Sequence, residues 1–211
     1  MPRQATFGAE ELAEAGLAVI AREGWSGLTM RATATQLGVS AMALYRVVSD
    51  SDALEAMVAD HVGRGLPVPD GPLTAALDTW ARTTHDRLQS LPGAAAFLLA
   101  SWTEIPSWLA IVEDFLARAE GEGLHGEEAV GTVNAIFAYT LARAQLRDYP
   151  STARPRQLAP LVAQPERYPL IRSNLSEFAI AQREKAFVYG LEALLEGLDS
   201  RRRGRHQYRR T

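Results

Sequence analysis

The residues best suited to contact DNA are concentrated between Thr29 and Arg46. Tyrosine and arginine donate hydrogen bonds to phosphate oxygens, and arginine also pairs with the edge of guanine. Arg31 falls at the start of an expected helix, where free backbone N–H groups also attract anions. Alanine and methionine offer apolar contact, for example to a thymine methyl group. The expected DNA-contacting residues are Thr29, Arg31, Ser40, Ala41, Met42, Tyr45 and Arg46.

Two short helices joined by a tight turn are predicted to position these side chains. Thr29 can cap the first helix, and Gly38 ends it because glycine readily adopts a positive φ. Ser40 can then cap a second helix over residues 41–47. This is the arrangement of a helix-turn-helix, whose second helix enters the major groove of DNA. The alternative to DNA contact is that these residues simply form a solvent-exposed helix face with a half-buried tyrosine.

The rest of the chain also shows helical periodicity, with no convincing strand pattern. Helices over residues 9–23 and 51–62 are expected to pack against the helix-turn-helix, and glycine and proline crowd into the segment that follows. The predicted fold is all-α, with an N-terminal three-helix helix-turn-helix domain and a larger helical domain. The expected divisions are residues 1–63, a linker over 64–72, the larger domain over 73–200, and a basic, disordered tail over 201–211.

Two segments carry a resemblance to a known family. They are GWSGLTMRATATQLGVS (Gly24 to Ser40) and ALYRVVSDSDALEAMV (Ala43 to Val58), and they resemble the tetracycline-repressor (TetR) family of transcriptional regulators. The resemblance implies a homodimer formed by the last two long helices, here residues 127–147 and 173–198. It also implies a palindromic double-stranded operator as partner, and release by a small, mostly apolar effector bound within residues 73–190. A twofold dimer would read two half-sites about one turn of DNA apart.

Some positions depart from the family pattern. Val47 stands where a histidine is common, Ser51 where a phosphate-binding lysine is usual, and Thr33 where an apolar core residue is typical. Residues 1–63 hold four arginines against eight acids. Two interpretations therefore stay open: a DNA-binding regulator whose affinity depends on low salt, or a ligand-binding or protein-interaction module whose degenerate helix-turn-helix no longer binds DNA.

The larger domain contains aromatic and polar residues on or beside apolar helix faces, as small-molecule sites do. Each aromatic residue taken alone is as consistent with a packed core. A polar group on an inward face needs a partner, which is either a ligand or an internal hydrogen bond. The expected ligand-binding residues are Trp80, His85, Trp102, Trp108, Asn134, Phe137 and Tyr139.

Composition argues against several other classes of protein. The chain has no cysteine, and its four histidines are scattered without the spacing of a metal site. No glycine-rich phosphate loop follows a strand, and no nucleophile elbow is present. We therefore expect no catalytic residue, no metal and no cofactor. Because no signal-peptide pattern or membrane-length apolar run is found, a cytoplasmic location is expected.

The formal net charge of -3 conceals an uneven distribution. The last eleven residues carry six arginines and no acid, and without them 16 basic residues stand against 25 acidic ones. An acidic body argues against a general nucleic-acid coat protein. The arginine-rich tail either adds charge for DNA binding or is a solvated end without a role, and the sequence leaves both possibilities open.

Overall fold

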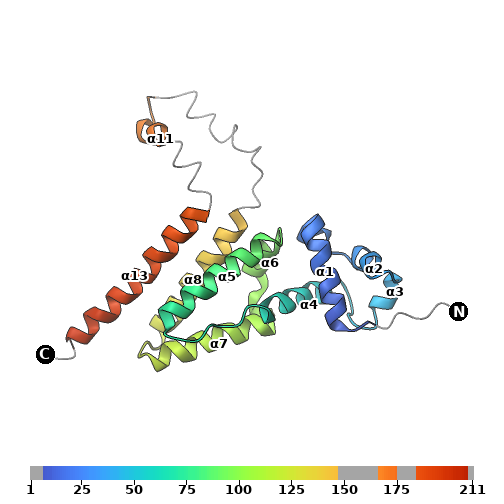
Figure 1. Cartoon of the computed structure of the whole chain (residues 1–211), viewed down its shortest axis with the longest axis horizontal. Coiled ribbons are helices and arrows are strands. Elements are labelled where there is room, and N and C mark those ends of the chain that lie inside the picture. The colour runs from blue at the N-terminus through green and yellow to red at the C-terminus, as the bar shows by residue number, and fades with distance from the viewer. Residues whose placement is uncertain (1–6, 147–165, 175–183, 209–211) are drawn as a thin grey trace.

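The computed structural model describes residues 7–146, 166–174 and 184–208 of the chain (Figure 1). No described residue lies in a strand, which confirms the predicted all-α fold. The headpiece consists of α1 (Ala9–Glu23), the short 3-10 helix η1 (Trp25–Gly27), α2 (Met30–Leu37), α3 (Ala41–Leu44) and α4 (Ser51–Arg64). The larger domain contains α5 (Leu73–Gln89), α6 (Ala94–Ser101), η2 (Trp102–Glu104), α7 (Pro106–Gly121), α8 (Glu127–Gln145), α11 (Pro169–Ser173) and α13 (Glu184–Tyr208).

Short-range hydrogen bonds set the ends of the headpiece helices. The side chain of Thr29 accepts from the Ala32 N–H at 3.1 Å and caps α2, as the sequence predicted. Gly38 ends α2 in the left-handed region with φ 70, where a side chain would be strained. Asp50 accepts from the Ala53 N–H at 2.8 Å and caps α4. These bonds link residues three positions apart, so they need no tertiary contact to form.

The second helix of the motif is shorter than predicted. α3 ends at Leu44, and residues 45–47 continue as hydrogen-bonded turns rather than as α-helix. Ser40 stands at the N-cap position, but its side chain makes no capping hydrogen bond. Buried Leu44 and Val48 hold this segment against the headpiece core. Tertiary anchoring therefore places the segment, because one turn of helix is too short to be stable by itself.

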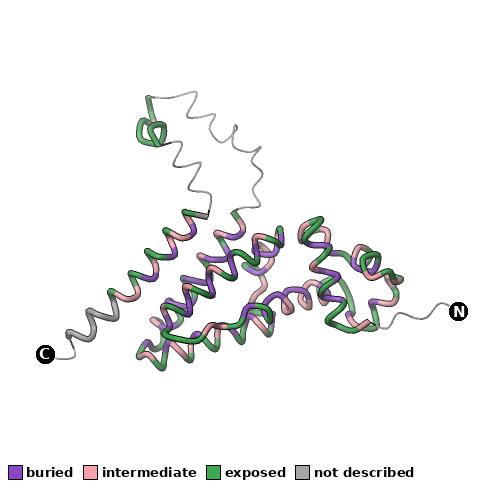
Figure 2. Tube along the Cα trace, viewed as in Figure 1, coloured by how far each residue is buried: buried purple, intermediate pink, exposed green. Residues whose placement is uncertain are grey.

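The larger domain is organised around α5, which packs against α7, α8 and α13. Leu77, Trp80, Ala81, Thr84 and Leu88 are buried at helical spacing on one face of α5. Figure 2 shows buried positions along the facing sides of α5 and α8 and exposed positions on their outer sides. Buried apolar residues form one cluster that continues from α1 through α4 into the larger domain. The headpiece and the larger domain thus share a continuous core.

The C-terminal region differs from the sequence-based expectations. A helix was expected to begin at Ser173, but Ser173 ends α11, and residues 175–183 lie outside the described part of the chain. The sequence also predicts a short helix near residues 157–163, and these residues lie outside the described part of the chain. Helix α13 continues to Tyr208, into the segment for which the sequence predicts a disordered tail. Arginine is a good helix former, and extending an existing helix costs much less than starting one.

Candidate DNA-binding surface and ligand-binding core

The predicted DNA-contacting side chains lie on the outer side of α2 and α3. Met42 is 75% exposed and Tyr45 is 52% exposed, although their neighbour Leu44 is completely buried. Thr29, Arg31, Ser40 and Arg46 are also exposed, and Ala41 is half-buried. Both exposed side chains flank Leu44, which anchors this segment in the headpiece core. The seven predicted residues therefore all lie at or near one exposed surface of the headpiece.

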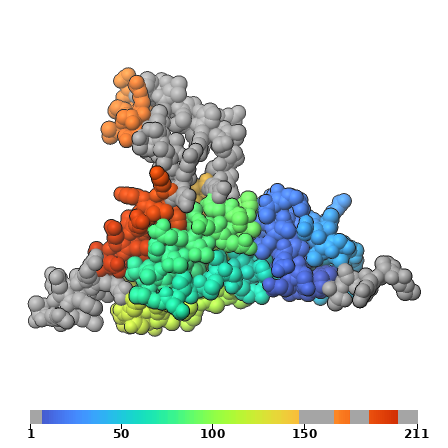
Figure 3. Space-filling view, in the orientation of Figure 1, coloured from blue at the N-terminus to red at the C-terminus, as the bar shows by residue number. Residues whose placement is uncertain are grey.

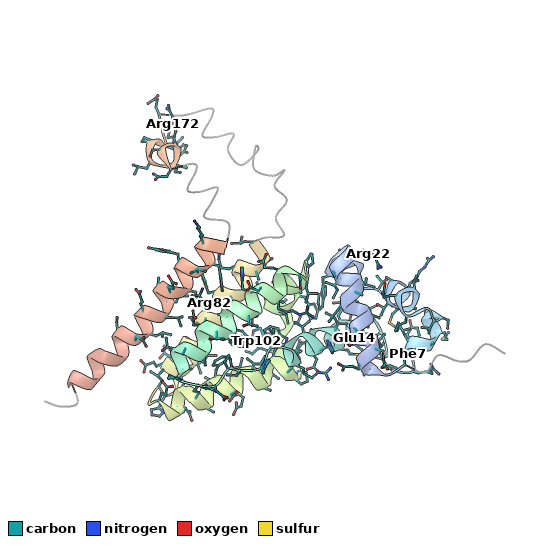
Figure 4. All side chains as sticks on the ribbon, viewed as in Figure 1. Phe7, Glu14, Arg22, Arg82, Trp102 and Arg172 are labelled. Atoms are coloured by element: carbon teal, nitrogen blue, oxygen red, sulfur yellow. The ribbon has the colours of Figure 1, made fainter. Side chains whose placement is uncertain are left out.

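Few charged side chains lie around this surface, and they differ in the protein groups that they contact. The Arg46 guanidinium lies over the Phe7 ring, 5.7 Å from its centroid, and its Nε donates to the Ala43 carbonyl at 3.3 Å. Arg22, by contrast, is bound to Glu23 and to Gln36 at the far end of α1 (Figure 4). Arg31 and Arg46 are the only charged residues between Leu28 and Val48. The sequence analysis did not identify Phe7, because it precedes the first periodic helix.

Nearby acids have structural roles that keep them ionised. The Ala53 N–H and the Ser49 hydroxyl hold the pKa of Asp50 below its ordinary value of 3.8. The Gly8 N–H holds the pKa of Glu11 below its ordinary value of 4.5 at the start of α1. Negative side chains at helix N-termini stabilise the helix dipole. Part of the acidic excess of the headpiece therefore caps helices rather than lining the α2–α3 surface.

α7 connects the headpiece to the larger domain. The Ser107 N–H donates to the Asp60 carboxylate at 2.8 Å, and the Ser107 hydroxyl donates to the Asp60 carbonyl at 2.9 Å. The Trp108 indole N–H donates to the Ala59 carbonyl of α4 at 3.1 Å. At the other end of α7, Arg118 donates to the carbonyls of Pro69 and Gly71 and fixes the linker. The α4–α7 joint, formed by residues 59–60 and 107–108, is thus fully hydrogen-bonded.

A second contact joins the headpiece to the larger domain through η1. The Trp25 N–H donates to the Pro92 carbonyl at 2.7 Å, and the Trp25 ring stacks on Phe97 with centroids 4.5 Å apart. The Trp25 indole N–H donates to Glu55 at 3.3 Å. Figure 3 shows the surfaces of the headpiece and the larger domain in direct contact. The headpiece is therefore held at two separate points.

Four of the predicted ligand-binding residues meet in one aromatic cluster, formed by Trp80, Trp102, Trp108, Phe115 and Phe137. Trp80 stacks on Phe137 with centroids 4.2 Å apart, and the edges of Trp108 and Phe115 face Trp80 at 6.2 and 5.7 Å. Trp102 lies 6.3 Å from Phe137 and is only half-buried; Figure 4 places it near the middle of the molecule. Residues from α5, η2, α7 and α8 contribute to this cluster.

Two other predicted residues, His85 and Tyr139, belong to a separate stack around Phe187 of α13. The His85 ring lies 3.9 Å from Phe187, and the Tyr139 ring lies 5.8 Å from Phe187 on centroids. The Tyr139 hydroxyl donates to the carbonyls of Ala186 and Phe187, and burial raises its pKa. Both His85 ring nitrogens have neighbours, Gln89 and Asp86. The internal hydrogen-bond interpretation of His85 therefore has direct support.

Asn134 does not lie where its position in the sequence suggested. It was expected on an inward face of its helix, but it is exposed on α8, whose buried residues are instead Thr132, Val133, Ile136 and Phe137. The apolar stripe of α8 is broad, so the sequence pattern alone did not decide which residues at its edge face the core. Asn134 could reach a ligand only from the outer surface of the chain.

Two buried polar groups on α5 have no hydrogen-bond partner among the residues that the structure describes. Trp80 is 1% exposed and Thr84 is 0% exposed, and neither the Trp80 indole N–H nor the Thr84 hydroxyl is bonded. An unsatisfied buried polar group costs about 1–3 kcal/mol. Thr84 was not among the predicted site residues, although the argument used for His85, a polar group on an inward face, applies equally to it. Thr33 in the headpiece is a further buried, unpartnered hydroxyl.

Within the described part of the chain, no group of three or more histidine, aspartate or glutamate side chains could hold a metal ion. No single described helix is long and apolar enough to cross a membrane; one bent pair, residues 94–104 with 106–121, meets that test only in combination.

The fold and the α2–α3 surface together define a class, the helix-turn-helix transcriptional regulators with a helical C-terminal domain. A family model described as the tetracyclin repressor-like C-terminal domain matches residues 67–202. The chain therefore belongs to the TetR family of transcriptional regulators, which confirms the resemblance seen in the sequence. It is 28% identical over 219 residues to the HTH-type transcriptional repressor DrrR1 of Streptomyces coeruleorubidus, covering 94% of this chain and 81% of that protein.

Solved structures share the same fold at low sequence identity. Apo ActR of Streptomyces coelicolor superposes with a TM-score of 0.76 at 20% identity, covering 93% of this chain and 96% of that one. ActR in complex with (S)-DNPA gives a TM-score of 0.74 at 19% identity over 92% and 98% of the two chains. BioQ bound to its double-stranded DNA operator gives a TM-score of 0.65 at 20% identity over 92% and 99%.

Proposed function

We propose that this protein is a homodimeric repressor that binds a palindromic operator through α2 and α3 and is released by a small, mostly apolar effector. The exposed Met42 and Tyr45 beside buried Leu44 carry the DNA-binding part of the proposal. Such exposure is unfavourable in a surface that contacts only water, and Arg31 and Arg46 supply cations beside it. The operator complex of BioQ and the repressor name of DrrR1 support the same function.

A second copy of the chain is the proposed occupant of the outer faces of α8 and α13. Val130 on α8 is 55% exposed, and Tyr189 on α13 is 77% exposed. The two helices pack side by side, with Tyr139 of α8 bonded to the α13 backbone. A paired surface of this kind is suited to a four-helix contact with an identical partner, which would place two α3 segments on one face of DNA.

The aromatic cluster is the proposed effector site, and Trp108 is the proposed route from the effector to DNA. The Trp108 ring faces Trp80 and Phe137, while its indole N–H is bonded to Ala59 of α4. A ligand that moves the cluster would therefore move α4 and, through the headpiece core, α3. The differential affinity needed for useful control is about 1–3 kcal/mol. (S)-DNPA bound to ActR shows that a protein of this fold takes a small molecule.

Selection of bound fragments from random duplex DNA at low salt tests the proposal. We expect one inverted repeat, with a steep loss of affinity as salt rises. The double variant Tyr45→Phe with Arg46→Ala should weaken binding to that repeat by about 10- to 100-fold, because each lost contact is worth about 1–3 kcal/mol. Arg87→Ala removes an exposed cation of the larger domain and is the matched control.

The opposite result identifies the alternative function. If a folded dimer recovered no DNA even at low salt, the chain would be a ligand-binding or protein-interaction module with a degenerate helix-turn-helix. The small number of free cations at the α2–α3 surface is the observation that keeps this alternative open.

A further inference from the structure

The Trp80 indole N–H and the Thr84 hydroxyl are both buried and have no hydrogen-bond partner among the described residues. The indole N–H groups of Trp25 and Trp108 both have protein partners, Glu55 and Ala59. Trp80 is as deeply buried as Trp108, yet its N–H has none. An indole N–H can only donate, so nothing but a hydrogen-bond acceptor can satisfy it.

Thr84 differs from three other helical threonines and shares its lack of a partner with Thr33 of the headpiece. A threonine within a helix can donate to the carbonyl four residues earlier, and Thr35, Thr83 and Thr140 do so. Thr84 lies completely buried and makes no such bond. Its hydroxyl is therefore not satisfied by the backbone of its own helix.

Trp80 and Thr84 are buried on the same face of α5. They are four positions apart, and side chains at this spacing are neighbours on a helix surface. That face packs into the aromatic cluster, where Phe137 stacks on Trp80 and Phe115 presents its edge. Two unpartnered donors beside aromatic rings form a site with one defined requirement, which is a hydrogen-bond acceptor carried on an apolar, ring-containing molecule.

We propose that the effector is an uncharged aromatic carbonyl compound, and that its carbonyl oxygen accepts hydrogen bonds from Trp80 Nε1 and Thr84 Oγ1. This inference deepens the proposed function. The ligand's role as an effector rests on that function, whereas its binding to the chain does not. A carbonyl oxygen has two lone pairs and can accept from both donors at once. Both donors are neutral, so a charged ligand would lose its hydration without gaining a counter-charge from them.

A matched pair of probes tests the proposal with the full chain. 2-Acetylnaphthalene and 2-ethylnaphthalene have the same rings and nearly the same shape, but only the first carries a carbonyl oxygen. Binding is followed by tryptophan fluorescence and by the thermal shift of the protein. We expect the ketone to bind about tenfold more tightly than the hydrocarbon, as one good hydrogen bond to an otherwise unsatisfied donor would produce.

Isosteric variants identify the groups responsible. Trp80→Phe removes the N–H and keeps an aromatic ring, and Thr84→Val replaces a hydroxyl by a methyl group. Each should reduce the preference for the ketone severalfold, and the double variant should abolish it. Thr140→Val is the matched control, because Thr140 is equally buried but its hydroxyl is bonded to Ile136. That variant should keep the wild-type preference.

The outcomes separate this inference from the proposed function. Equal binding of both probes, no binding of the ketone by the wild-type chain, or an unchanged preference in the double variant would overturn the inference. Release of the selected operator is measured separately. If the ketone binds with the expected preference but leaves the operator complex intact at saturation, the ligand chemistry stands and the effector-controlled switch fails.

Discussion

In the headpiece, bonds between residues three positions apart set the starts of α2 and α4, whereas in the larger domain ring contacts between residues far apart in the sequence join the helices. Thr29 caps α2 through Ala32, and Asp50 caps α4 through Ala53. In the larger domain, Trp80 meets Phe137 and His85 meets Phe187. Local bonds specify where a helix begins, and distant rings specify how helices pack together.

The α4–α7 joint and the neighbouring aromatic cluster differ in how well their buried donors are hydrogen-bonded. The α4–α7 joint satisfies its buried donors, including the Trp108 N–H. The adjacent aromatic cluster leaves Trp80 and Thr84 unsatisfied. In the proposed switch, the hydrogen bonds of the α4–α7 joint couple movement of α7 to α4. A cluster with unmet donors is where a ligand gains most on binding.

Removing the Trp108 side chain should have the largest effect on this arrangement. Trp108→Ala deletes a completely buried ring and should lower the free energy of unfolding by about 3–5 kcal/mol, measured by urea denaturation. Trp108→Phe keeps a six-membered ring and removes only the hydrogen bond to the Ala59 carbonyl, so its cost should be smaller, about 1–3 kcal/mol. Equal costs for the two variants would show that ring packing contributes little to the joint.

A methyl group added at Gly63 should disturb the joint without removing any bond donor. A Cβ there would collide with the Ser107 hydroxyl and with the Trp108 ring, 2.9 Å away. Gly63→Ala should therefore cost about 1–3 kcal/mol and force α4 away from α7. Gly121→Ala is the control on α7, since nothing lies within 4 Å of its added Cβ. If both variants had the same stability, α4 and α7 would not be in close contact in solution.

The smallest expected effect is the loss of the charged cap on α4. Asp50 has a lowered pKa in the folded chain, so its stabilisation is present above the ordinary value of 3.8 and disappears as the pH falls through the folded value. Asp50→Asn keeps a capping oxygen without the charge. The difference in stability between wild type and Asp50→Asn should therefore shrink on acidification. A difference that stays constant down to about pH 2 would contradict the cap.

Much of the headpiece could be predicted from the sequence because its signals are local. Thr29 and Gly38 act within one turn of their own positions, so their residue types were enough to place the ends of α2. The exposed positions of Met42 and Tyr45 followed from the same spacing. The end of α3 at Leu44 did not follow, because anchoring by the headpiece core decides it.

The sequence by itself determined the all-α class, the helix-turn-helix and the family. It also supplied tryptophans at positions 25, 80, 102 and 108 without distinguishing their roles. Only the tertiary structure decided that Trp108 meets the Ala59 carbonyl, 49 positions away, and that Trp80 meets no acceptor. It also placed Asn134 on the outside. The physical reason is that a hydrogen bond depends on distance and direction in space, and these are set by how whole helices pack.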